Sequence, residues 1–203
     1  MMDAVPLMEQ EKKNFDFFLG LPEYDRRELK LETVKGSQVL EPLFEFSGAC
    51  LGCGETPYVI LASQLFGDRM LVANATGCSS IYGGNLPTTP WTITQDGRGP
   101  SWSNSLFEDN AEFGLGFRLA VTQHRDQAEH LVRELAGKLG SELADGLLGT
   151  QEKDEAEIYE QRERVKALRE KLAKIDDPRA KRLESLSSYL LRKSVGIRGG
   201  EAC

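Results

Sequence analysis

The sequence predicts an α/β fold in which a parallel sheet with flanking helices is joined to a helical region. Residues 70–73 form a short, continuous apolar run, which is typical of a strand buried in a parallel sheet. This run leads into the polar loop 74–78, and open α/β sheets bind their ligands beyond the carboxyl ends of the strands. From residue 127 to about 195 the apolar residues have helical spacing, and Val195-Gly196-Ile197 then indicates another strand.

Composition restricts the class of protein. With 203 residues, 40% of them hydrophobic, the chain can form one packed domain, or one domain with a helical appendage. Its formal net charge of −7 argues against nucleic-acid binding, which needs a basic surface. We find no apolar run of the ~18 residues that a membrane helix needs, and no signal-peptide pattern. We therefore expect a cytoplasmic protein, in which clustered cysteines favour a metal or redox site.

The first half of the chain predicts short elements separated by loops. We expect a polar lead-in segment over 1–40 and an extended approach to the first cysteines at 44–46. Thr56-Pro57 predicts the start of a helix, with Thr56 as its N-cap. Residues 79–103 are rich in Gly, Pro, Ser and Thr and predict a long loop, which is uncommon unless it is functional.

Ser105 and Glu108 match a capping box and predict the start of a helix there. Gly114 and Gly116 are poor helix formers, so we expect a close backbone contact where they lie. Asp109 and Glu112, near the first turns, are expected to interact with the helix dipole, and a bound cation is the alternative.

Further helices are expected in the second half. Gly140-Ser141 is expected to end one helix and begin the next, and Asp177-Pro178 to begin another. The charged segment 151–175 predicts a helix with a narrow apolar seam and a solvated face, and a partner-binding coiled coil is the alternative. The seam consists of Ile158, Val165, Leu168, Leu172 and Ile175.

Three of the four cysteines lie in two glycine-rich loops. Cys50 and Cys53 form a C-x2-C pair, and Cys78 follows after 24 intervening residues. Thiolates at short spacing, beside glycine N–H groups that can bond sulfide, favour an iron–sulfur cluster. A zinc site needs a fourth ligand that is not evident, and a redox dithiol leaves Cys78 unexplained. All three interpretations remain open on spacing alone.

Other side chains are ambiguous. Glu55 either caps the helix that follows it or contacts a cofactor. His124 and His130 have no partner at ligand spacing, so we expect solvated or capping roles. Trp91 and Trp102 are expected to anchor the long loop by packing rather than to stack on a base.

Four stretches of the chain resemble the thiamine-diphosphate domain of pyruvate:ferredoxin (flavodoxin) oxidoreductases. These stretches are 30–38, 44–58, 66–84 and 99–116, and they include Gly-Ala-Cys-x-Gly-Cys-Gly-Glu-Thr-Pro and Asn-Ala-Thr-Gly-Cys-Ser-Ser. The resemblance covers most of 12–135 and continues more loosely to about residue 195.

The resemblance implies an enzyme that decarboxylates pyruvate on thiamine diphosphate, forms acetyl-CoA and passes single electrons through [4Fe-4S] clusters to ferredoxin or flavodoxin. Cys50, Cys53 and Cys78 match three of the four thiolates of the cluster nearest the thiamine. Glu55 and Cys78 match positions that contact thiamine diphosphate. The implied partners are pyruvate, CoA, the redox protein, the remaining domains and a second copy in a homodimer, with no nucleic acid and no membrane.

On this resemblance we expect an incomplete thiamine-diphosphate-binding fold. Residues 1–40 form the lead-in, 41–126 the core of the thiamine-diphosphate and iron–sulfur domain, and 127–194 a helical insertion. Residues 195–203 form the start of the strand and loop for diphosphate and Mg²⁺, with Glu201 in place of the family's magnesium-binding Asp. The fourth cluster cysteine would lie beyond residue 203, and we do not expect Cys203 to take its place as a ligand.

We therefore expect a fragment of the enzyme without turnover of its own. Two alternatives are a stand-alone iron–sulfur or zinc module, and one part of an enzyme split over two chains.

Overall fold

The computed structural model describes residues 5–85, 87–106 and 108–198. The chain divides into two compact units, 1–41 and 42–203, and each is described by itself. The predictions for residues 199–201 and Cys203 concern positions outside the described residues.

The first unit is helical. It contains α1 (Val5–Leu19), the 3₁₀ turn η1 (Arg26–Glu28) and α2 (Val34–Gln38). The sequence predicted only a lead-in segment here, because the few apolar residues of 1–20 are clustered and do not recur at helical spacing. Thr33 caps α2, since its hydroxyl oxygen accepts a hydrogen bond from the Gly36 N–H at 3.1 Å.

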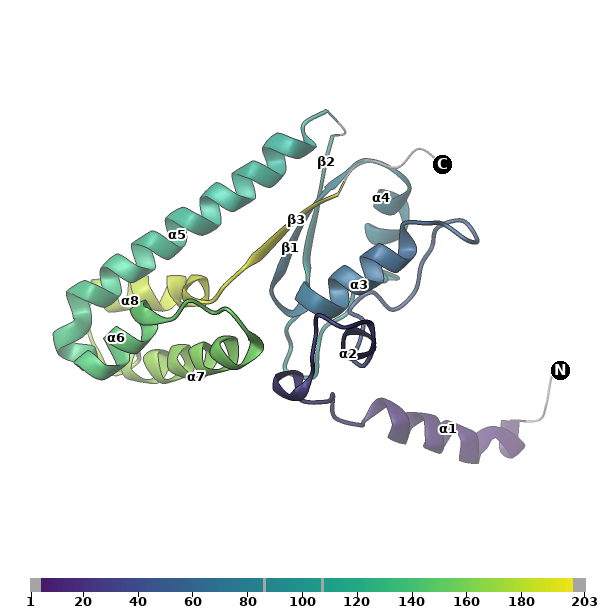
Figure 1. Ribbon diagram of the computed structural model, residues 1–203, viewed down its shortest axis with the longest axis horizontal. Coiled ribbons are helices and arrows are strands. Elements are labelled where there is room, and N and C mark those ends of the chain that lie inside the picture. Colours follow the sequence, from purple (N-terminus) through teal and green to yellow (C-terminus); the bar gives the residue numbers. More distant parts are fainter. Residues whose placement is uncertain (1–4, 86, 107, 199–203) are drawn as a thin grey trace. The chain divides into compact units, whose positions relative to one another are not determined.

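The second unit is built on a three-stranded parallel sheet. The strands are β1 (Met70–Ala75), β2 (Ser101–Ser105) and β3 (Ser194–Arg198), in the order β2-β1-β3 (Figure 1). In this register Val72 of β1 lies beside Trp102 of β2 and Gly196 of β3. The predicted α/β fold with a parallel sheet and flanking helices is confirmed, as are the strands at 70–73 and 195–197.

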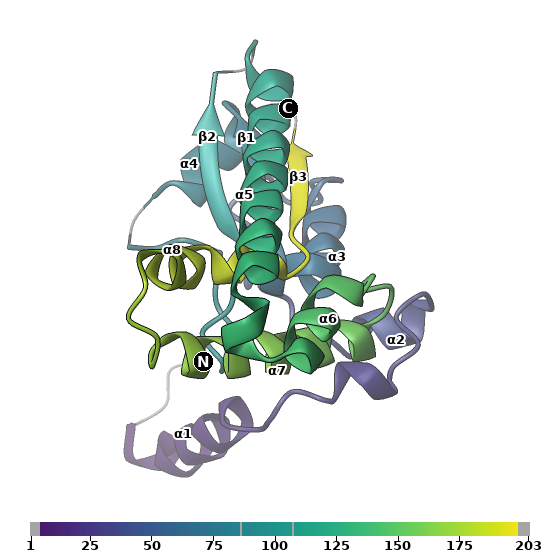
Figure 2. The same ribbon diagram turned by 90° about the vertical axis from the view of Figure 1, so that its left-hand side faces the viewer.

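Helices cover both faces of the sheet. α5 (Asn110–Leu139) lies along one face, and α3 (Thr56–Phe66) and α4 (Cys78–Gly83) lie on the other (Figures 1 and 2). The short turn η2 (Gly67–Arg69) joins α3 to β1. All three strands therefore present their carboxyl ends between the starts of α4 and α5.

The remaining helices form a second core around the distal half of α5. They are α6 (Ser141–Gly149), α7 (Glu155–Leu172), α8 (Pro178–Leu186) and the turn η3 (Ser187–Leu190). Their buried side chains form one cluster with those of α5, which includes Ala128, Val132, Leu135, Leu139, Leu147, Val165, Leu168, Leu172, Leu183, Leu186 and Leu190. The predicted seam of α7 thus packs inside this chain, which leaves no room for the coiled-coil alternative.

Both predicted helix boundaries in this region are confirmed. Gly140, at a φ of 92°, ends α5 and precedes α6, and only glycine adopts this region without strain. Asp177 caps α8, because its carboxylate accepts the Arg179 N–H at 2.9 Å, and Pro178 is the first helical residue. The domain boundary expected between residues 126 and 127 falls inside the continuous helix α5, so residues on both sides of that boundary belong to one element.

Several local predictions are wrong. Ser105 ends β2 instead of capping a helix, and α5 begins at Asn110. The expected loop 79–103 contains most of α4 and the first residues of β2. The helix predicted to start at Thr56-Pro57 is confirmed as α3, but Thr56 is its first residue and Glu55, not Thr56, occupies the N-cap position. Tertiary pairing outweighs these short local patterns.

Of the two glycines in α5, only one makes the expected contact. A Cβ on Gly114 would lie 2.3 Å from Ile197 Cγ1, whereas one on Gly116 would meet nothing within 4 Å. The close approach of α5 to β3 at Gly114 is therefore confirmed, and the same prediction for Gly116 is wrong.

Among the described residues, none of the helices combines the length and apolar composition that would let it cross a bilayer.

Candidate functional site at the carboxyl end of the sheet

The first two cysteines lie in a tight turn. The Cys53 N–H donates to the Cys50 carbonyl oxygen at 3.0 Å, and Gly52 has a φ of 77°. A positive φ at the third residue of a four-residue turn favours glycine, which explains Gly52 in the sequence. Cys50 is exposed and Cys53 half-buried, and both are free thiols.

Contacts on both sides hold this turn in place. The hydroxyls of Ser47 and Thr56 are hydrogen-bonded at 2.9 Å, and the Ala49 N–H donates to Ser47 Oγ at 3.2 Å. Gly48 packs directly on α4, because a Cβ there would lie only 2.5 Å from Tyr82 Cβ. The turn that carries Cys50 and Cys53 is therefore fixed against the helix that begins at Cys78.

Cys78 follows β1 and is held by a buried amide network. Asn74 is fully buried, and its side-chain NH₂ donates to Asn104 Oδ1 of β2 at 2.9 Å. The Ser79 hydroxyl donates to Asn74 Oδ1 at 3.0 Å, and Asn104 Nδ2 donates to Thr76 Oγ1 at 3.0 Å. Buried amides that are hydrogen-bonded on both ends restrict local motion, so this network fixes the loop 76–78.

Glu55 is paired with the last residue of β3. The Arg198 Nε donates to Glu55 Oε1, and the Arg198 Nη2 donates to the Tyr82 hydroxyl at 2.7 Å. The Arg198 carbonyl oxygen accepts from Asn110 Nδ2 of α5 at 2.7 Å. Arg198 thereby joins the start of α3, the middle of α4 and the start of α5.

This ion pair is largely shielded from water. The side chains of Arg198 and Glu55 are 12% and 21% exposed. Burial disfavours the charged guanidinium, but hydrogen bonds to Glu55 and Tyr82 outweigh burial, so the pKa of Arg198 is raised above its usual value. Glu55 occupies the N-cap position of α3, but its side chain makes no cap hydrogen bond to that helix, and a cofactor contact remains a prediction.

The predicted cysteine ligands all lie at one end of the sheet, but their side chains are not arranged around a common metal position. Cys78 is half-buried and, like Cys50 and Cys53, forms no disulfide. Across residues 5–85, 87–106 and 108–198, no three His, Cys, Asp or Glu side chains lie close enough to hold a metal ion. The assignment of the three thiolates to a cluster therefore stays a prediction.

The two histidines differ. His130 is exposed, with Nε2 3.2 Å from a Glu134 carboxylate oxygen, as expected of a solvated residue. His124 is half-buried, and its ring centroid lies 4.7 Å from that of Tyr189, so the solvated or capping role is wrong for it. Its contact partner comes from η3, 65 positions along the chain, and no local pattern indicates such a contact.

The two tryptophans pack as expected. The Trp91 ring meets the Phe44 ring edge to face at a centroid distance of 5.0 Å. Trp102 of β2 lies against Gly83, where a Cβ would be 3.3 Å from the indole ring. Both rings anchor the segment between α4 and β2.

Sequence reasoning missed Arg198, Tyr82, Asn74 and Asn104. Asn74 and Asn104 each lie near the end of a strand, where polar residues in an apolar context mark a site at the sheet's carboxyl end. Arg198 directly follows the predicted strand 195–197, and a charged side chain at the end of this strand likewise indicates a site there. No local pattern could show that it reaches Glu55, 143 positions earlier.

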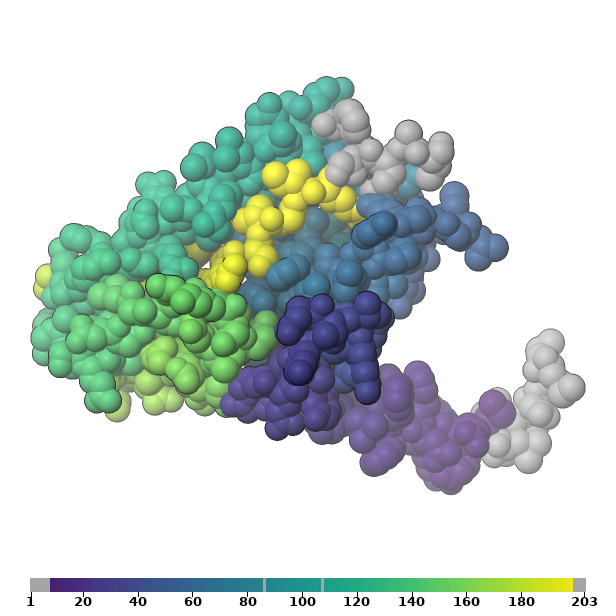
Figure 3. Space-filling model, viewed as in Figure 1, coloured from purple at the N-terminus to yellow at the C-terminus, as the bar shows by residue number. Residues whose placement is uncertain are grey.

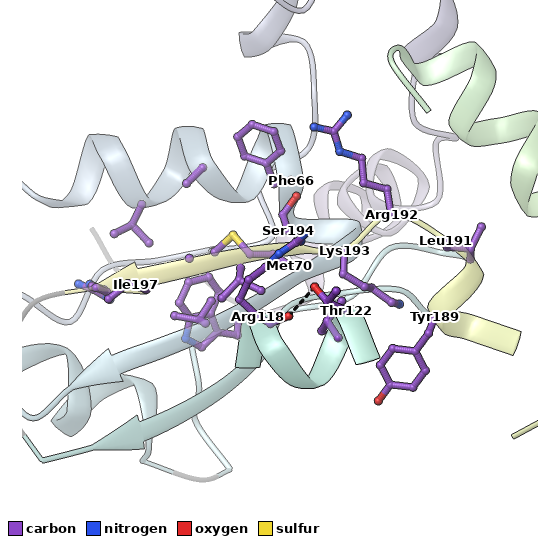
Figure 4. Close-up of a pocket in the computed structure, with 18 of the residues that line it drawn as sticks. Phe66, Met70, Arg118, Thr122, Tyr189, Leu191, Arg192, Lys193, Ser194 and Ile197 are labelled. Carbon is purple, nitrogen blue, oxygen red and sulfur yellow. Dashed lines mark hydrogen bonds between the residues drawn. The ribbon is translucent and has the colours of Figure 1, made fainter. Parts of the chain in front are cut away.

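A second feature of the unit is a cavity of about 790 Å³ beside β3. Residues of α3, β1 and α5 line it, together with Tyr189 and the run from Leu191 to Arg198 (Figure 4). In the space-filling view β3 is visible between α5 and α3 (Figure 3).

Fold and site together define an α/β protein with cysteine-bearing loops at the carboxyl end of a parallel sheet. The chain is homologous over almost its whole length to a segment of the pyruvate-flavodoxin oxidoreductases. A pyruvate-flavodoxin oxidoreductase of Trichormus variabilis is 58% identical over 205 residues, which cover 99% of this chain. A probable pyruvate-flavodoxin oxidoreductase of Escherichia coli is 53% identical over 99% of the chain, and a pyruvate:ferredoxin oxidoreductase of Moorella thermoacetica is 44% identical over 98%.

The chain spans only 16–18% of the length of these three curated relatives. None of the protein-family models matches it. The sequence-based recognition of the family, and of a match to a fragment of the enzyme, is confirmed by these relatives.

Proposed function

We propose that this chain is the segment of a pyruvate:flavodoxin (ferredoxin) oxidoreductase in which an iron–sulfur cluster lies next to thiamine diphosphate. In this proposal Cys50, Cys53 and Cys78 are three of the four ligands of a [4Fe-4S] cluster, and Glu55 and Cys78 contact the thiamine cofactor. Pyruvate, CoA, Mg²⁺ and a flavodoxin or ferredoxin belong to the whole enzyme, as do its homodimeric assembly and cytoplasmic location.

One observation carries the proposal: the C-x2-C turn, Cys78 and Glu55 share one end of the sheet. Gly48 against Tyr82 connects the turn to α4, and Arg198 connects Glu55 to the same helix. The donor set also suits the cluster, because the three cysteines form no disulfide and their side chains are at least partly accessible. A loop shared by the two cofactors would keep the gap for electron transfer short.

The residues have distinct tasks in this site. When bound, the cluster would accept electrons one at a time and pass them on. The network of Asn74 and Asn104 holds the backbone beside Cys78, so this thiolate is the fixed ligand. Gly48 keeps the turn 50–53 against α4, and the open surroundings of Gly52 and Gly54 leave space beside Cys50 and Cys53 for a bound group.

Anaerobic reconstitution with ferrous iron and sulfide tests the proposal. We expect iron and acid-labile sulfide in equal amounts with visible charge-transfer absorption, and loss of both in Cys78→Ser and Cys53→Ser. Cys203→Ser is the matched control, and it is expected to keep the cluster. Zinc without sulfide, or full iron content in Cys78→Ser, would contradict the proposal.

A further inference from the structure

The turn that carries Cys50 and Cys53 brings the backbones of these two cysteines together. The Cys53 N–H donates to the Cys50 carbonyl oxygen at 3.0 Å, which closes a four-residue turn. The Cα atoms at the two ends of such a turn lie less than about 7 Å apart. A disulfide spans Cα separations of about 4.4–6.8 Å. The backbone therefore holds the two cysteines at a separation that a disulfide bridges.

The chain around the turn maintains this conformation. Gly52 has a φ of 77° at the third position of the turn, where glycine is favoured. On the flanks of the turn, the hydroxyls of Ser47 and Thr56 are hydrogen-bonded at 2.9 Å. Folding therefore removes most of the backbone freedom that joining the two sulfur atoms would otherwise remove. This arrangement raises the effective concentration of one thiol at the other.

A dissolved reagent has access to the turn. Cys50 is exposed, Cys53 is half-buried, and Leu51 between them is fully exposed. The loop ahead of α3 projects outward from the sheet (Figure 1). A Cβ on Gly52 or Gly54 would meet nothing within 4 Å, so there is room for a small reagent. Thiol–disulfide exchange depends on access to the attacking sulfur, which makes Cys50 the first thiol to react.

Cys78 lies on a different loop. It is the first residue of α4, and the side chains of Asn74 and Asn104 hold the residues before it. In the sequence, α3, η2 and β1 separate it from Cys53. We therefore expect Cys78 to remain a thiol when the other two cysteines are joined.

We propose that, in the absence of the cluster, a low-molecular-weight disulfide oxidises Cys50 and Cys53 to an intramolecular disulfide. The Cys50 thiolate attacks one sulfur atom of the reagent, the first thiol product leaves, and a mixed disulfide remains on Cys50. The Cys53 thiolate then attacks the Cys50 sulfur and displaces the second thiol product. The two cysteines thereby lose two electrons and two protons, and the reagent becomes two thiols.

The disulfide and the cluster exclude each other, because both use the sulfur atoms of Cys50 and Cys53; this consequence rests on the proposed function. An empty site that becomes oxidised binds no iron until a thiol reductant opens the bond. The disulfide also keeps both sulfur atoms from irreversible oxidation to sulfinic and sulfonic acids. The turn thus protects the empty ligand site in a reversible form.

Equilibration with reduced and oxidised glutathione tests the disulfide. The chain carries Cys203→Ser, which leaves three of the four cysteines, and the remaining thiols are labelled with N-ethylmaleimide and counted by intact mass. We expect one labelled thiol, at Cys78, and an equilibrium constant for the Cys50–Cys53 disulfide about tenfold higher than in urea. Three labelled thiols at every glutathione ratio, glutathione retained as the main product, a disulfide that includes Cys78, or an equal constant in urea would each overturn the proposal.

Two glycine variants test the role of the turn. Gly52→Ala places a side chain at a positive φ and is expected to lower the disulfide constant about tenfold. Gly54→Ala is the matched control and should leave the constant unchanged, because Gly54 has no positive φ and a Cβ at either position meets nothing within 4 Å. Equal constants for the two variants would contradict the role of the turn.

Cysteine variants identify the bond. We expect Cys50→Ser and Cys53→Ser to abolish the disulfide and Cys78→Ser to leave its constant unchanged. A lower constant in Cys78→Ser would show that Cys78 takes part, which contradicts the proposal.

Iron uptake separates this inference from the proposed function. The oxidised chain is expected to take up no iron and sulfide until dithiothreitol is added, and uptake before reduction would contradict the exclusion. If the reduced chain also forms no cluster, the proposed function fails. The thiol count needs no iron, so it still decides whether the disulfide forms.

Discussion

At the scale of single residues, Arg198 is the side chain on which the site geometry depends most. It joins Glu55, Tyr82 and Asn110, which belong to the starts or middles of three different helices. Removing one partner of a shielded ion pair leaves the other charge without compensation, so the cost exceeds that of an exposed pair.

We predict that Arg198→Met lowers the free energy of unfolding by about 1–3 kcal/mol, measured by urea denaturation. Lys181→Met is the control, because its pair with Asp176 is exposed, at 72% and 97%, and the expected change is below about 0.5 kcal/mol. Equal losses in the two variants would show that the Arg198 pair adds nothing beyond a surface contact.

Gly48 shows how a residue without a side chain can determine a contact. A Cβ there would lie 2.5 Å from Tyr82 Cβ, an atom close to the backbone of α4 that cannot rotate away. Gly48→Ala should therefore push the cysteine turn from α4 and cost about 1–3 kcal/mol in unfolding free energy.

Gly54→Ala, in the same loop, meets nothing within 4 Å and serves as the matched control, with an expected change near zero. The alkylation rate of Cys50 and Cys53 reports on the turn itself, and we expect it to change in Gly48→Ala alone. Unchanged stability and reactivity of Gly48→Ala would contradict the close contact.

At the scale of elements, α5 and α8 are linked at the cap of α8. Asp177 receives hydrogen bonds from the side chain of Arg179, from Lys138 of α5 at 2.8 Å and from the Arg179 N–H. These contacts hold the pKa of the Asp177 carboxyl well below its usual range, with the Arg179 side chain as the largest cause. The cap and the bridge between the two helices therefore depend on one ionised group.

We predict that acid lowers the stability of the folded chain partly by protonating the Asp177 carboxylate. A carboxyl whose pKa is lowered in the folded state stabilises that state fully above its unfolded pKa of about 3.9. This contribution disappears as the pH falls from there towards the folded-state value. The urea midpoint of Asp177→Asn should thus depend less on pH below about pH 4 than that of the natural chain, and Asp176→Asn, 97% exposed, should behave like the natural chain. An identical acid dependence for all three proteins would refute the assignment.

An element can be predicted from the sequence when the residues that determine it are adjacent in the chain. The strand at 70–73, the stop at Gly140 and the cap at Asp177 each result from a few adjacent residues, and all were predictable. β2 was missed because Ser101–Ser105 is polar, and its pairing with β1 determines its conformation. The pair of Glu55 with Arg198 was missed because neither residue's neighbours indicate the other.

At the scale of the whole second unit, α5 mechanically joins the sheet to the helical core. Its first half packs on β1 and β3, with Val121 buried, and its second half contributes Ala128 to Leu139 to the helical cluster. The helix is continuous over 30 residues. We therefore expect the sheet and the helical cluster to unfold in one transition in the natural chain.

Interrupting α5 between the two cores should separate these transitions. Gln123 is exposed and lies between Val121 and Ala128, so Gln123→Pro breaks the helix, at a cost of about 3 kcal/mol or more, without removing a core side chain. Trp91 and Trp102 both belong to the sheet region, so tryptophan fluorescence follows the sheet while far-ultraviolet circular dichroism follows mainly the helices. The two urea curves should coincide in the natural chain and in Gln123→Ala, and diverge in Gln123→Pro. Coincident curves in the proline variant would mean that contacts other than α5 carry the coupling, and divergent curves in the natural chain would mean that the two cores are independent.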